Sequence, residues 1–254
     1  MSRHQQRLAA RRGAVQSVLP TAPVAPGTSA SDVAQSLLGG TVLSLHTVVV
    51  SLRAHHERRA RWEHTARSVG LEHWAYFDGI NGSALGLRTD QPSRHSRTNR
   101  TAPLPLSGGE LGCLLSHTAV WRAALALGVE ELCVVEDDME FVDPTRFADQ
   151  WRKFREEIPT DWLMVHVGAV DRRPIPVSER CVRVVQQYGT WFMLLRRDAL
   201  IILSAAADRA AASEPADWLL LDLFATGRVY RPTELLVRVR DEVGIQLEVD
   251  SAIS

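Results

Sequence analysis

Segments patterned as strands alternate with segments patterned as helices from Thr41 onward, and this alternation limits the possible folds more than any other feature of the sequence. β-Branched and aromatic residues predict strands in TVLSLHTVVVSL, EHWAYFDG, LCVV, DWLMVHVG, YGTWFMLLRR and VYRPTELLVRVR. Helical spacing and helix-start residues predict helices in HHERRARWEHTARSVG, SGGELGCLLSHTAVWRAALALG, DPTRFADQWRKFREEI, DALIILSAAADRAA and PADWLLLDLFATG. Such alternation favours a mostly parallel mixed sheet with helices on both faces, so the expected fold class is α/β.

Two of the expected helices begin with recognisable capping residues. Ser107 and Glu110 have the spacing of a capping box, and Asp143 precedes Pro144 at the start of a later helix. The helix after Ser107 carries an apolar stripe on one face, made of Leu111, Leu114, Leu115, Thr118 and Leu125. We expect that face to be the buried one.

The sequence divides into an N-terminal tail, residues 1–40, and one domain, residues 41–254. The tail is rich in Ala, Ser, Pro and Arg and has no sustained periodicity, so we expect it to be disordered. It also resembles a transit peptide, but its prolines interrupt a long amphipathic helix and no apolar segment supports secretion. A polar, Arg-rich loop at about 83–105 is expected to be either an acceptor-binding lid or disordered.

Charge and composition argue against several classes of function. The formal net charge is −1 and acidic residues alternate with basic ones, so no net field favours nucleic acid or anionic lipid. The longest apolar stretches, such as ALIILSAAA, fall short of the roughly 18 residues that a transmembrane helix requires, while peripheral membrane contact stays open. Cys113, Cys133 and Cys181 form no CxxC motif, which indicates small core residues in a reducing, cytoplasmic compartment.

The motifs of several common enzyme classes are absent from the sequence. It has no GxxxxGK[ST], no GxGxxG after a strand, no HExxH and no GxSxG. The motifs that define P-loop, Rossmann dinucleotide-binding, zincin and α/β-hydrolase proteins are therefore missing. A phospho-acceptor receiver domain needs a lysine at a strand end. Lys153, the only lysine, falls within an expected helix instead.

Three adjacent carboxylates, Glu136, Asp137 and Asp138, follow the expected strand LCVV. Ligands of α/β sheets bind beyond the carboxyl ends of the strands, so these acids have the position of a site. Because side chains alternate along a strand, Glu136 and Asp138 are expected to point one way and Asp137 the other. Two hard oxygen ligands suit Mg²⁺ or Mn²⁺ acting on a nucleotide diphosphate. The alternative is a solvated acidic run.

Two segments together resemble the signature of a known family. GGELGCLLSHTAVW followed by LCVVEDDMEF is similar to the pair found in glycosyltransferase family 25, the lipooligosaccharide and collagen galactosyltransferase-like group. The matching residues are Gly109, Glu110, Gly112, Cys113, Ser116, His117, Trp121, Glu136, Asp137 and Asp138. Other segments follow in the family's order, so the resemblance covers nearly everything from about Thr41 onward.

This resemblance implies a GT-A-type fold and transfer of a hexose, usually galactose, from a UDP-sugar to a hydroxyl of a glycan or similar acceptor, with inversion. The acceptor is expected to belong to bacterial surface-glycan (lipopolysaccharide) or specialised-metabolite synthesis. The acidic triplet takes a DxD-like role, with Asp138 as direct ligand of Mn²⁺ or Mg²⁺, and Glu136 and Asp137 supporting it through ribose or water. The ion would neutralise charge on the departing nucleoside diphosphate.

An inverting transfer also needs one general base to take the acceptor proton. The resemblance points to Asp217 in EPADWLL, at the start of an expected helix whose N-terminus favours the ionised carboxylate. Glu214 and Asp222 are the backup candidates. The alternative for Asp217 is a plain helix cap.

The resemblance implies further contacts with the nucleotide. Arg53, Arg58 and Asp78 lie at or just after the first two expected strands, where the family binds the nucleotide. For Arg58 the alternative is a solvated charge run.

Glu110, His117 and Trp121 share a helix stripe apart from the apolar face, and we expect Glu110 and His117 to border the donor site. A structural role is the alternative for His117.

Some positions are less typical of the family. Arg240 stands where a glutamine is expected, and the 83–105 loop is unusually rich in arginine. Tyr188 and Trp191 are candidates to stack on a sugar, although aromatic residues in strands are more often core. Two other functions stay open: another nucleotide-diphosphate transferase, and a non-catalytic sugar-nucleotide-binding or scaffold relative.

Overall fold

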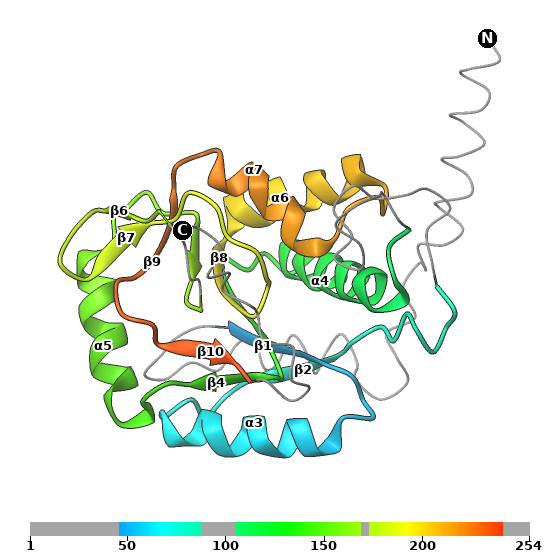
Figure 1. Ribbon diagram of the computed structural model, residues 1–254, viewed down its shortest axis with the longest axis horizontal. Coiled ribbons are helices and arrows are strands. Elements are labelled where there is room, and N and C mark those ends of the chain that lie inside the picture. Colours follow the sequence, from blue (N-terminus) through cyan, green and yellow to red (C-terminus); the bar gives the residue numbers. More distant parts are fainter. Residues whose placement is uncertain (1–45, 88–104, 169–172, 241–254) are drawn as a thin grey trace, which may run out of the picture.

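The computed structural model describes residues 46–87, 105–168 and 173–240 (Figure 1). The expected tail at 1–40 and most of the expected loop at 83–105 lie outside the described residues. No helix within the described ranges has the length and apolar character needed to cross a membrane.

An eight-stranded mixed sheet forms the centre of the molecule, in the order β2-β1-β3-β8-β5-β9-β7-β6. β1 pairs in parallel with both β2 and β3, β5 pairs in parallel with β9, and the other neighbours are antiparallel. Its strands are β1 (His46–Ser51), β2 (Ala75–Asp78), β3 (Glu131–Glu136), β5 (Met164–His166), β6 (Ile175–Pro176), β7 (Cys181–Arg183), β8 (Phe192–Arg196) and β9 (Val229–Pro232). The α/β class with a mixed sheet is confirmed.

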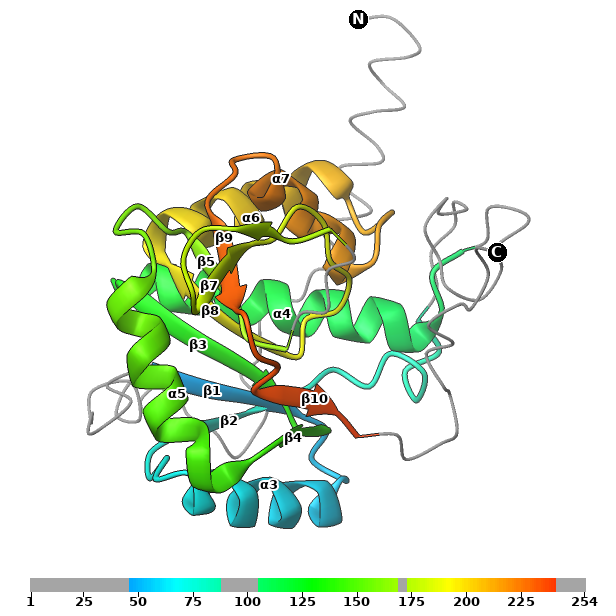
Figure 2. The same ribbon diagram turned by 60° about the vertical axis from the view of Figure 1, so that its left-hand side comes forward.

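Helices cover both faces of this sheet (Figures 1 and 2). One face carries α4, α6, η1 and α7, and the other carries α3 and α5. Their bounds are α3 (His56–Ser68), α4 (Gly108–Ala126), α5 (Pro144–Glu157), α6 (Arg197–Ala210), the 3₁₀ helix η1 (Ala216–Leu220) and α7 (Leu221–Phe224).

Alternation along the central strands divides the core into two layers. In β3, Leu132 and Val134 pack against the helices of the first face, while Cys133 and Val135 pack against those of the second. This is the expected consequence of side chains that point to opposite faces of a strand. The helices on either side therefore enclose β3 and fix where its carboxyl end lies.

The capping predictions for two helices are confirmed. The Ser107 side chain accepts the Glu110 N–H and the Glu110 carboxylate accepts the Ser107 N–H, which completes a capping box at the start of α4. Asp143 caps α5 by accepting the N–H groups of Thr145 and Arg146. The expected apolar stripe of α4 is buried or packs against the core.

The single strand expected in VYRPTELLVRVR is wrong, because the segment forms two strands in different sheets. β9 ends at Pro232, and the next residue, Thr233, still donates its N–H to the Arg180 carbonyl. The chain then forms β10 (Val237–Val239), which pairs antiparallel with β4 (Met139–Phe141), a short strand that the sequence did not predict. β4 follows the acidic turn directly, so this small sheet holds one side of the candidate site.

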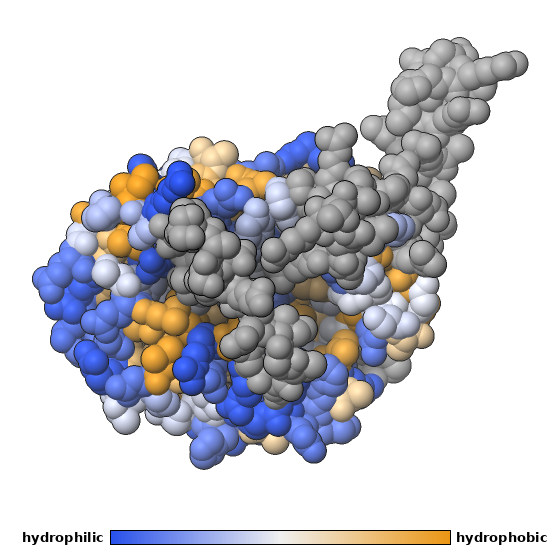
Figure 3. Space-filling view, in the orientation of Figure 1, coloured by the Kyte–Doolittle hydropathy of each residue, from blue (hydrophilic) through white to orange (hydrophobic). Residues whose placement is uncertain are grey.

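Outside the grey atoms, the face shown in Figure 3 is mostly polar, with several apolar areas among the polar ones. Val142, directly after β4, and Leu235, two residues before β10, are exposed large apolar side chains. The Val142 N–H donates to the Leu236 carbonyl, so these two segments lie side by side. An apolar area of this small size is normal for a protein surface.

Candidate active site

The carboxyl ends of three adjacent parallel strands form the base of the site. Ser51 ends β1 beside Asp78 at the end of β2, and Val50 of β1 aligns with Glu136 at the end of β3. Parallel strands bring their carboxyl ends to one edge, and ligands of α/β proteins bind there. The predicted position of the acidic triplet at such an edge is therefore what the structure shows.

Asp137 is buried and has compensating partners. The Ser51 hydroxyl donates to Asp137 Oδ2 at 2.6 Å, and Arg58 Nη1 donates to Oδ1 at 3.4 Å. His55 Nδ1 lies 3.8 Å from Oδ2. This carboxylate is thus held by β1 and by the start of α3.

Of the three acids, Asp138 has the fewest hydrogen bonds and positive charges to compensate its carboxylate. Its Oδ1 atom is buried without a hydrogen-bond partner among the described residues, and Arg58 Nη1 lies 3.8 Å from Oδ2. Burial, followed by the negative charges of Glu136 and Asp137, raises the pKa of Asp138 to about 7, although Arg58 opposes the shift. A partly buried carboxylate with an unused oxygen and surplus negative charge around it fits a cation.

Glu136 has side-chain partners that differ from those of the other two acids, although its negative charge still raises the pKa of Asp138. His117 Nε2 lies 3.0 Å from Glu136 Oε1, and the Thr190 hydroxyl donates to the same oxygen. The reason is that β3 ends at Glu136, and Asp137 and Asp138 form a turn in which strand alternation no longer applies. Asp137 and Asp138 instead share Arg58.

Arg58 is only 28% exposed at its side chain, because it reaches back from α3 to the acidic turn. The alternative of a solvated charge run is therefore wrong for this residue. Its guanidinium contacts both carboxylates and provides the positive charge nearest to the turn among the ion pairs of the described residues. Arginine suits the phosphates of a nucleotide equally well.

Arg53 and Asp78 lie close together at the strand ends, but a neighbouring arginine holds Asp78 more tightly. Arg53 Nε lies 3.8 Å from Asp78 Oδ2 with its side chain 62% exposed. Arg59 donates to Asp78 Oδ1 at 2.6 Å, to the Ser51 carbonyl at 3.0 Å and to the Ser51 hydroxyl at 3.1 Å. Its guanidinium also lies 4.5 Å from the centre of the Tyr76 ring. Arg59 was not predicted.

His117 is fully buried, and so is Trp121 one turn later. The prediction that their helix stripe lies apart from the apolar face is wrong, because α4 buries residues on most of its circumference. Burial alone would lower the pKa of His117, but Cys113 and Glu136 beside it raise that pKa to about 10. These neighbours favour the protonated form of His117 beside Glu136 in the metal-free protein. Glu110 lies at the start of this helix, in its capping box.

Asp217 is buried in η1, at its second residue rather than at the cap of an α-helix. Its Oδ2 atom accepts the Gly189 N–H at 3.3 Å, and His166 Nε2 lies 2.8 Å from the Gly189 carbonyl. Thr190, the next residue, contacts Glu136. The segment Gly189–Thr190 thus connects the candidate base to the end of β3.

The backup bases lie elsewhere. Asp222 forms an ion pair with Arg209 of α6, and its side chain is 45% exposed. Glu214 is half-buried in the segment before η1. Of the aromatic candidates, Tyr188 is exposed and its ring centre lies 5.3 Å from that of Trp218, next to Asp217.

Trp191 is half-buried and lies edge-on to His166, with ring centres 6.1 Å apart. Arg240 has two contacts near the acidic turn. Its backbone N–H donates to the Asp138 carbonyl at 2.8 Å, and its side chain pairs with Glu140 at 3.0 Å.

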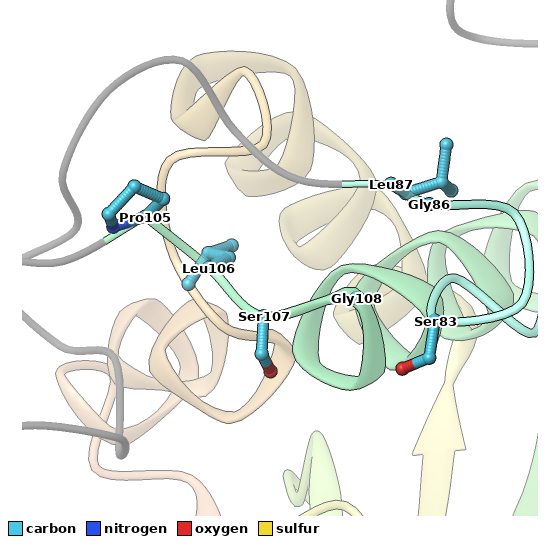
Figure 4. Close-up of a pocket in the computed structure, with 7 residues that line it drawn as sticks. All are labelled: Ser83, Gly86, Leu87, Pro105, Leu106, Ser107 and Gly108. Carbon is cyan, nitrogen blue, oxygen red and sulfur yellow. The ribbon is translucent and has the colours of Figure 1, made fainter.

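A separate hollow of about 400 Å³ lies at the start of α4 (Figure 4). Its lining residues are Ser83, Gly86, Leu87, Pro105, Leu106, Ser107 and Gly108. None of the predicted site residues lines it. Both segments that border it run into the part of the 83–105 loop that the structure does not describe.

Several residues of the site were missed, and one of them, Ser51, had a usable signal. Ser51 ends a strand just as Glu136 does. The rule that ligands bind beyond the carboxyl ends of strands, here called the strand-end rule, would therefore have identified it. Thr190 precedes β8, which runs antiparallel to β3, so the beginning of β8 lies at the site edge. The Glu136 N–H donates to the Trp191 carbonyl at 2.8 Å there. Nothing in the sequence pattern singled out Arg59 or Gly189.

Residues 44–188 match the family model described as glycosyltransferase family 25 (LPS biosynthesis protein). The chain belongs to glycosyltransferase family 25. The resemblance that the sequence suggested is confirmed by this match, which includes α4 and the acidic turn and ends directly before Gly189.

Relatives within family 25 include proteins named as galactosyltransferases and proteins named as inactive. The probable inactive glycosyltransferase 25 family member 3 of Rattus norvegicus is 28% identical over 180 residues, or 66% of this chain and 30% of its own length. The procollagen galactosyltransferase 2 of Mus musculus is 36% identical over 78 residues, 30% of this chain and 12% of its own. The chain thus spans less than a third of the length of these relatives.

Among solved structures, mannose-1-phosphate geranyltransferase from Thermus thermophilus is similar with a TM-score of 0.33 and 12% identity, over 74% of this chain and 73% of the other.

Proposed function

We propose that this member of family 25 is a metal-dependent, inverting glycosyltransferase that moves a hexose, with galactose favoured, from a UDP-sugar to a hydroxyl of a glycan or other acceptor. The observation that carries this proposal is Asp138: a partly buried carboxylate beside two further acids, with one oxygen that has no hydrogen-bond partner among the described residues, at the edge of the sheet where ligands bind. A glycan of the lipopolysaccharide type is the favoured acceptor, in keeping with the description of the family model.

In this proposal Asp138 and Asp137 hold Mn²⁺ or Mg²⁺. Both ions prefer carboxylate oxygens and leave coordination positions to water and phosphate. When bound, such an ion would neutralise charge that develops on the departing UDP. Glu136, which faces His117 and Thr190, acts on the ion only through its charge and its neighbours.

The nucleotide end of the donor is proposed to lie over the ends of β1 and β2. Arg53 is exposed there and Asp78 lies beside it, so one offers a cation and the other an acceptor for ribose hydroxyls. Arg58, between these strands and the acidic turn, is in reach of the diphosphate in this arrangement.

Asp217 is the proposed general base. Its carboxylate takes the proton of the acceptor hydroxyl as that oxygen bonds to the anomeric carbon, while the bond from this carbon to UDP breaks and UDP leaves with the electron pair. The Gly189 N–H donates to this carboxylate and fixes its direction. Tyr188 and Trp218 beside it offer apolar ring faces to a sugar.

The place of action is proposed to be the cytoplasm, in solution or peripherally at a membrane. All three cysteines are free, which is typical of a reducing compartment.

A second candidate is a non-catalytic relative that binds sugar nucleotide without turnover. The name of the rat relative, which includes the word inactive, favours this candidate. The retained acids at 136–138 and at 217 favour the enzyme. A third candidate, another nucleotide-diphosphate transferase, differs in leaving a nucleotide rather than a sugar on the acceptor.

Thermal unfolding with UDP-, GDP-, TDP- and CMP-sugars, each with and without Mn²⁺, tests the proposal. A donor at about 100 times its Kd adds about 2.7 kcal/mol to the free energy of unfolding. We expect one UDP-sugar to stabilise the protein only with Mn²⁺, and slow release of UDP from that donor. Asp138→Asn should abolish both effects, whereas Asp198→Asn, an exposed acid on α6, should keep both.

Stabilisation without UDP release would favour the non-catalytic relative. Stabilisation that is independent of metal, or unchanged in Asp138→Asn, would contradict the metal role of the acidic turn.

A further inference from the structure

A second polar cluster lies on the other side of the end of β3 from Asp137 and Asp138. It consists of Cys113 and His117 of α4 and Glu136 of β3, whose potential ligand atoms all lie within 4.8 Å of one another. We infer that this cluster binds a thiophilic divalent cation, with Zn²⁺ as the preferred ion. Binding of Zn²⁺ here does not depend on the proposed transfer reaction.

The three side chains are arranged by secondary structure. Cys113 and His117 are four residues apart on α4, so both project from the same side of the helix. The capping box at Ser107 and the packing of α4 against the core hold that side against β3. Glu136 arrives from the strand end, where its backbone N–H is fixed by the Trp191 carbonyl. The cluster is therefore built on two rigid elements.

The donor set is that of zinc. Thiolate sulfur, imidazole nitrogen and carboxylate oxygen are the three side-chain ligand types of Zn²⁺ in proteins, and three such ligands leave a fourth position for water. A thiolate and a carboxylate together balance the charge of the ion. Magnesium and manganese prefer oxygen ligands, so they favour the turn at Asp137 and Asp138 instead.

The cluster is partly buried but still accessible to an ion. His117 is fully buried, while Glu136 is 21% exposed at its side chain and Cys113 is half-buried. The His117 Nδ1 atom is also buried without a hydrogen-bond partner within the described ranges. Thr190 borders the cluster, with its hydroxyl oxygen 3.8 Å from Cys113 Sγ. An ion can therefore approach from the side of Cys113 and Glu136.

Cobalt is a suitable probe, because Co²⁺ occupies zinc sites and gives a charge-transfer absorption when a thiolate binds it. We expect the metal-free protein to bind one equivalent of Co²⁺ with this absorption, and added Zn²⁺ to remove the signal. Cys113→Ser should abolish the absorption, while the matched control Cys181→Ser, which removes a buried thiol of β7, should keep it. Glu136→Gln should weaken binding by more than about 10-fold.

Alkylation provides a second measurement that needs no variant of the core. Cys113 is the most accessible of the three thiols, so it should react first, and Zn²⁺ should protect it. Asp138→Asn tests the separation of the two sites: the cobalt absorption should persist even though Mn²⁺-dependent donor binding is lost. No thiolate absorption, its persistence in Cys113→Ser, or its loss in Asp138→Asn would each overturn the inference.

Discussion

Gly189 donates its backbone N–H to the carboxylate of Asp217, and the two residues lie 28 positions apart in the chain. On its other side, the Gly189 carbonyl lies 2.8 Å from His166 Nε2. Gly189 has a φ of +95°, which residues other than glycine rarely adopt. One glycine backbone unit therefore joins the candidate base to a buried histidine of β5.

Replacing Gly189 should damage this link. In Gly189→Ala the added Cβ would lie 2.6 Å from ring atoms of Trp191 in addition to the unfavourable φ. Gly70→Ala is the control, because its φ is +75° but no atom lies within 4 Å of the added Cβ. We expect Gly189→Ala to cost about 1–3 kcal/mol more in the free energy of unfolding than Gly70→Ala. Urea unfolding measures the free energy of unfolding of both variants. Equal losses would show that the Trp191 ring moves aside at no cost in stability.

Asp217→Asn should reduce catalysis without reducing donor binding. The amide cannot take the acceptor proton, so we expect kcat to fall by about 10²–10⁴-fold while the Kd for the donor stays unchanged. Asp208→Asn, which removes an exposed partner of Arg122, is the control and should leave both constants alone. Steady-state kinetics together with donor titration measure the two effects. A full loss of donor binding in Asp217→Asn would mean that this residue holds the donor.

His166 should make the protein less stable in mild acid. Burial lowers the pKa of His166 below its ordinary value of 6.5, against the opposing effect of the Gly189 carbonyl. Below about pH 6.5 the unfolded chain therefore binds a proton that the folded chain rejects, so stability falls as the pH falls, by up to about 1.4 kcal/mol per pH unit. Above that pH this contribution is constant. Unfolding of His166→Gln between pH 7.5 and 5.5 should show a correspondingly flatter dependence.

His117 should give the stability of the metal-free protein the opposite pH dependence to that of His166. Its pKa in the folded protein is raised to about 10, so its stabilising charge is fully present below pH 6.5 and is lost as the pH rises toward 10. The Glu136→Gln variant removes the carboxylate that pairs with this charge. We expect its stability to depend less on pH between 7 and 10 than that of the parent, and an unchanged dependence would contradict the charged state of His117.

Substitutions of the two arginines at Asp78 should differ in their effects, one mainly on stability and the other mainly on donor binding. Arg59 is 19% exposed and bonds Asp78 and Ser51, so Arg59→Ala should cost about 1–3 kcal/mol of unfolding free energy. Arg53 is 62% exposed, so Arg53→Ala should change stability by less than about 1 kcal/mol and weaken donor binding instead. Urea unfolding and donor titration on both variants measure this contrast. Equal stability losses would assign Arg53 a structural role.

The sequence predicted the elements of this fold better than their directions. Helix caps such as Ser107 and Asp143 depend on neighbours within one turn, so local spacing was enough to locate them. The antiparallel direction of β8 depends on pairing with β3 and β5, which no local pattern encodes. As a result the segment just before β8, with Gly189 and Thr190, was not predicted as part of the site.

Within the candidate site, the strand-end rule located the acidic triplet but not the orientation of its members. The change from strand to turn after Glu136 decides which way each carboxylate points, and β10 stabilises that turn from far along the chain. Arg58 likewise looked like part of an exposed charge run, because its contact with the turn is a tertiary one.

The antiparallel pairing of β4 with β10 has a consequence for synthesis of the protein. The Arg240 N–H supports the acidic turn, and Arg238 pairs with Glu140 across a separation of 98 residues. A nascent chain that has already released β3 and β4 from the ribosome still lacks this support until β10 follows. The acidic turn should therefore reach its final shape late, and a chain terminated before β10 should contain most of the sheet without a competent metal site.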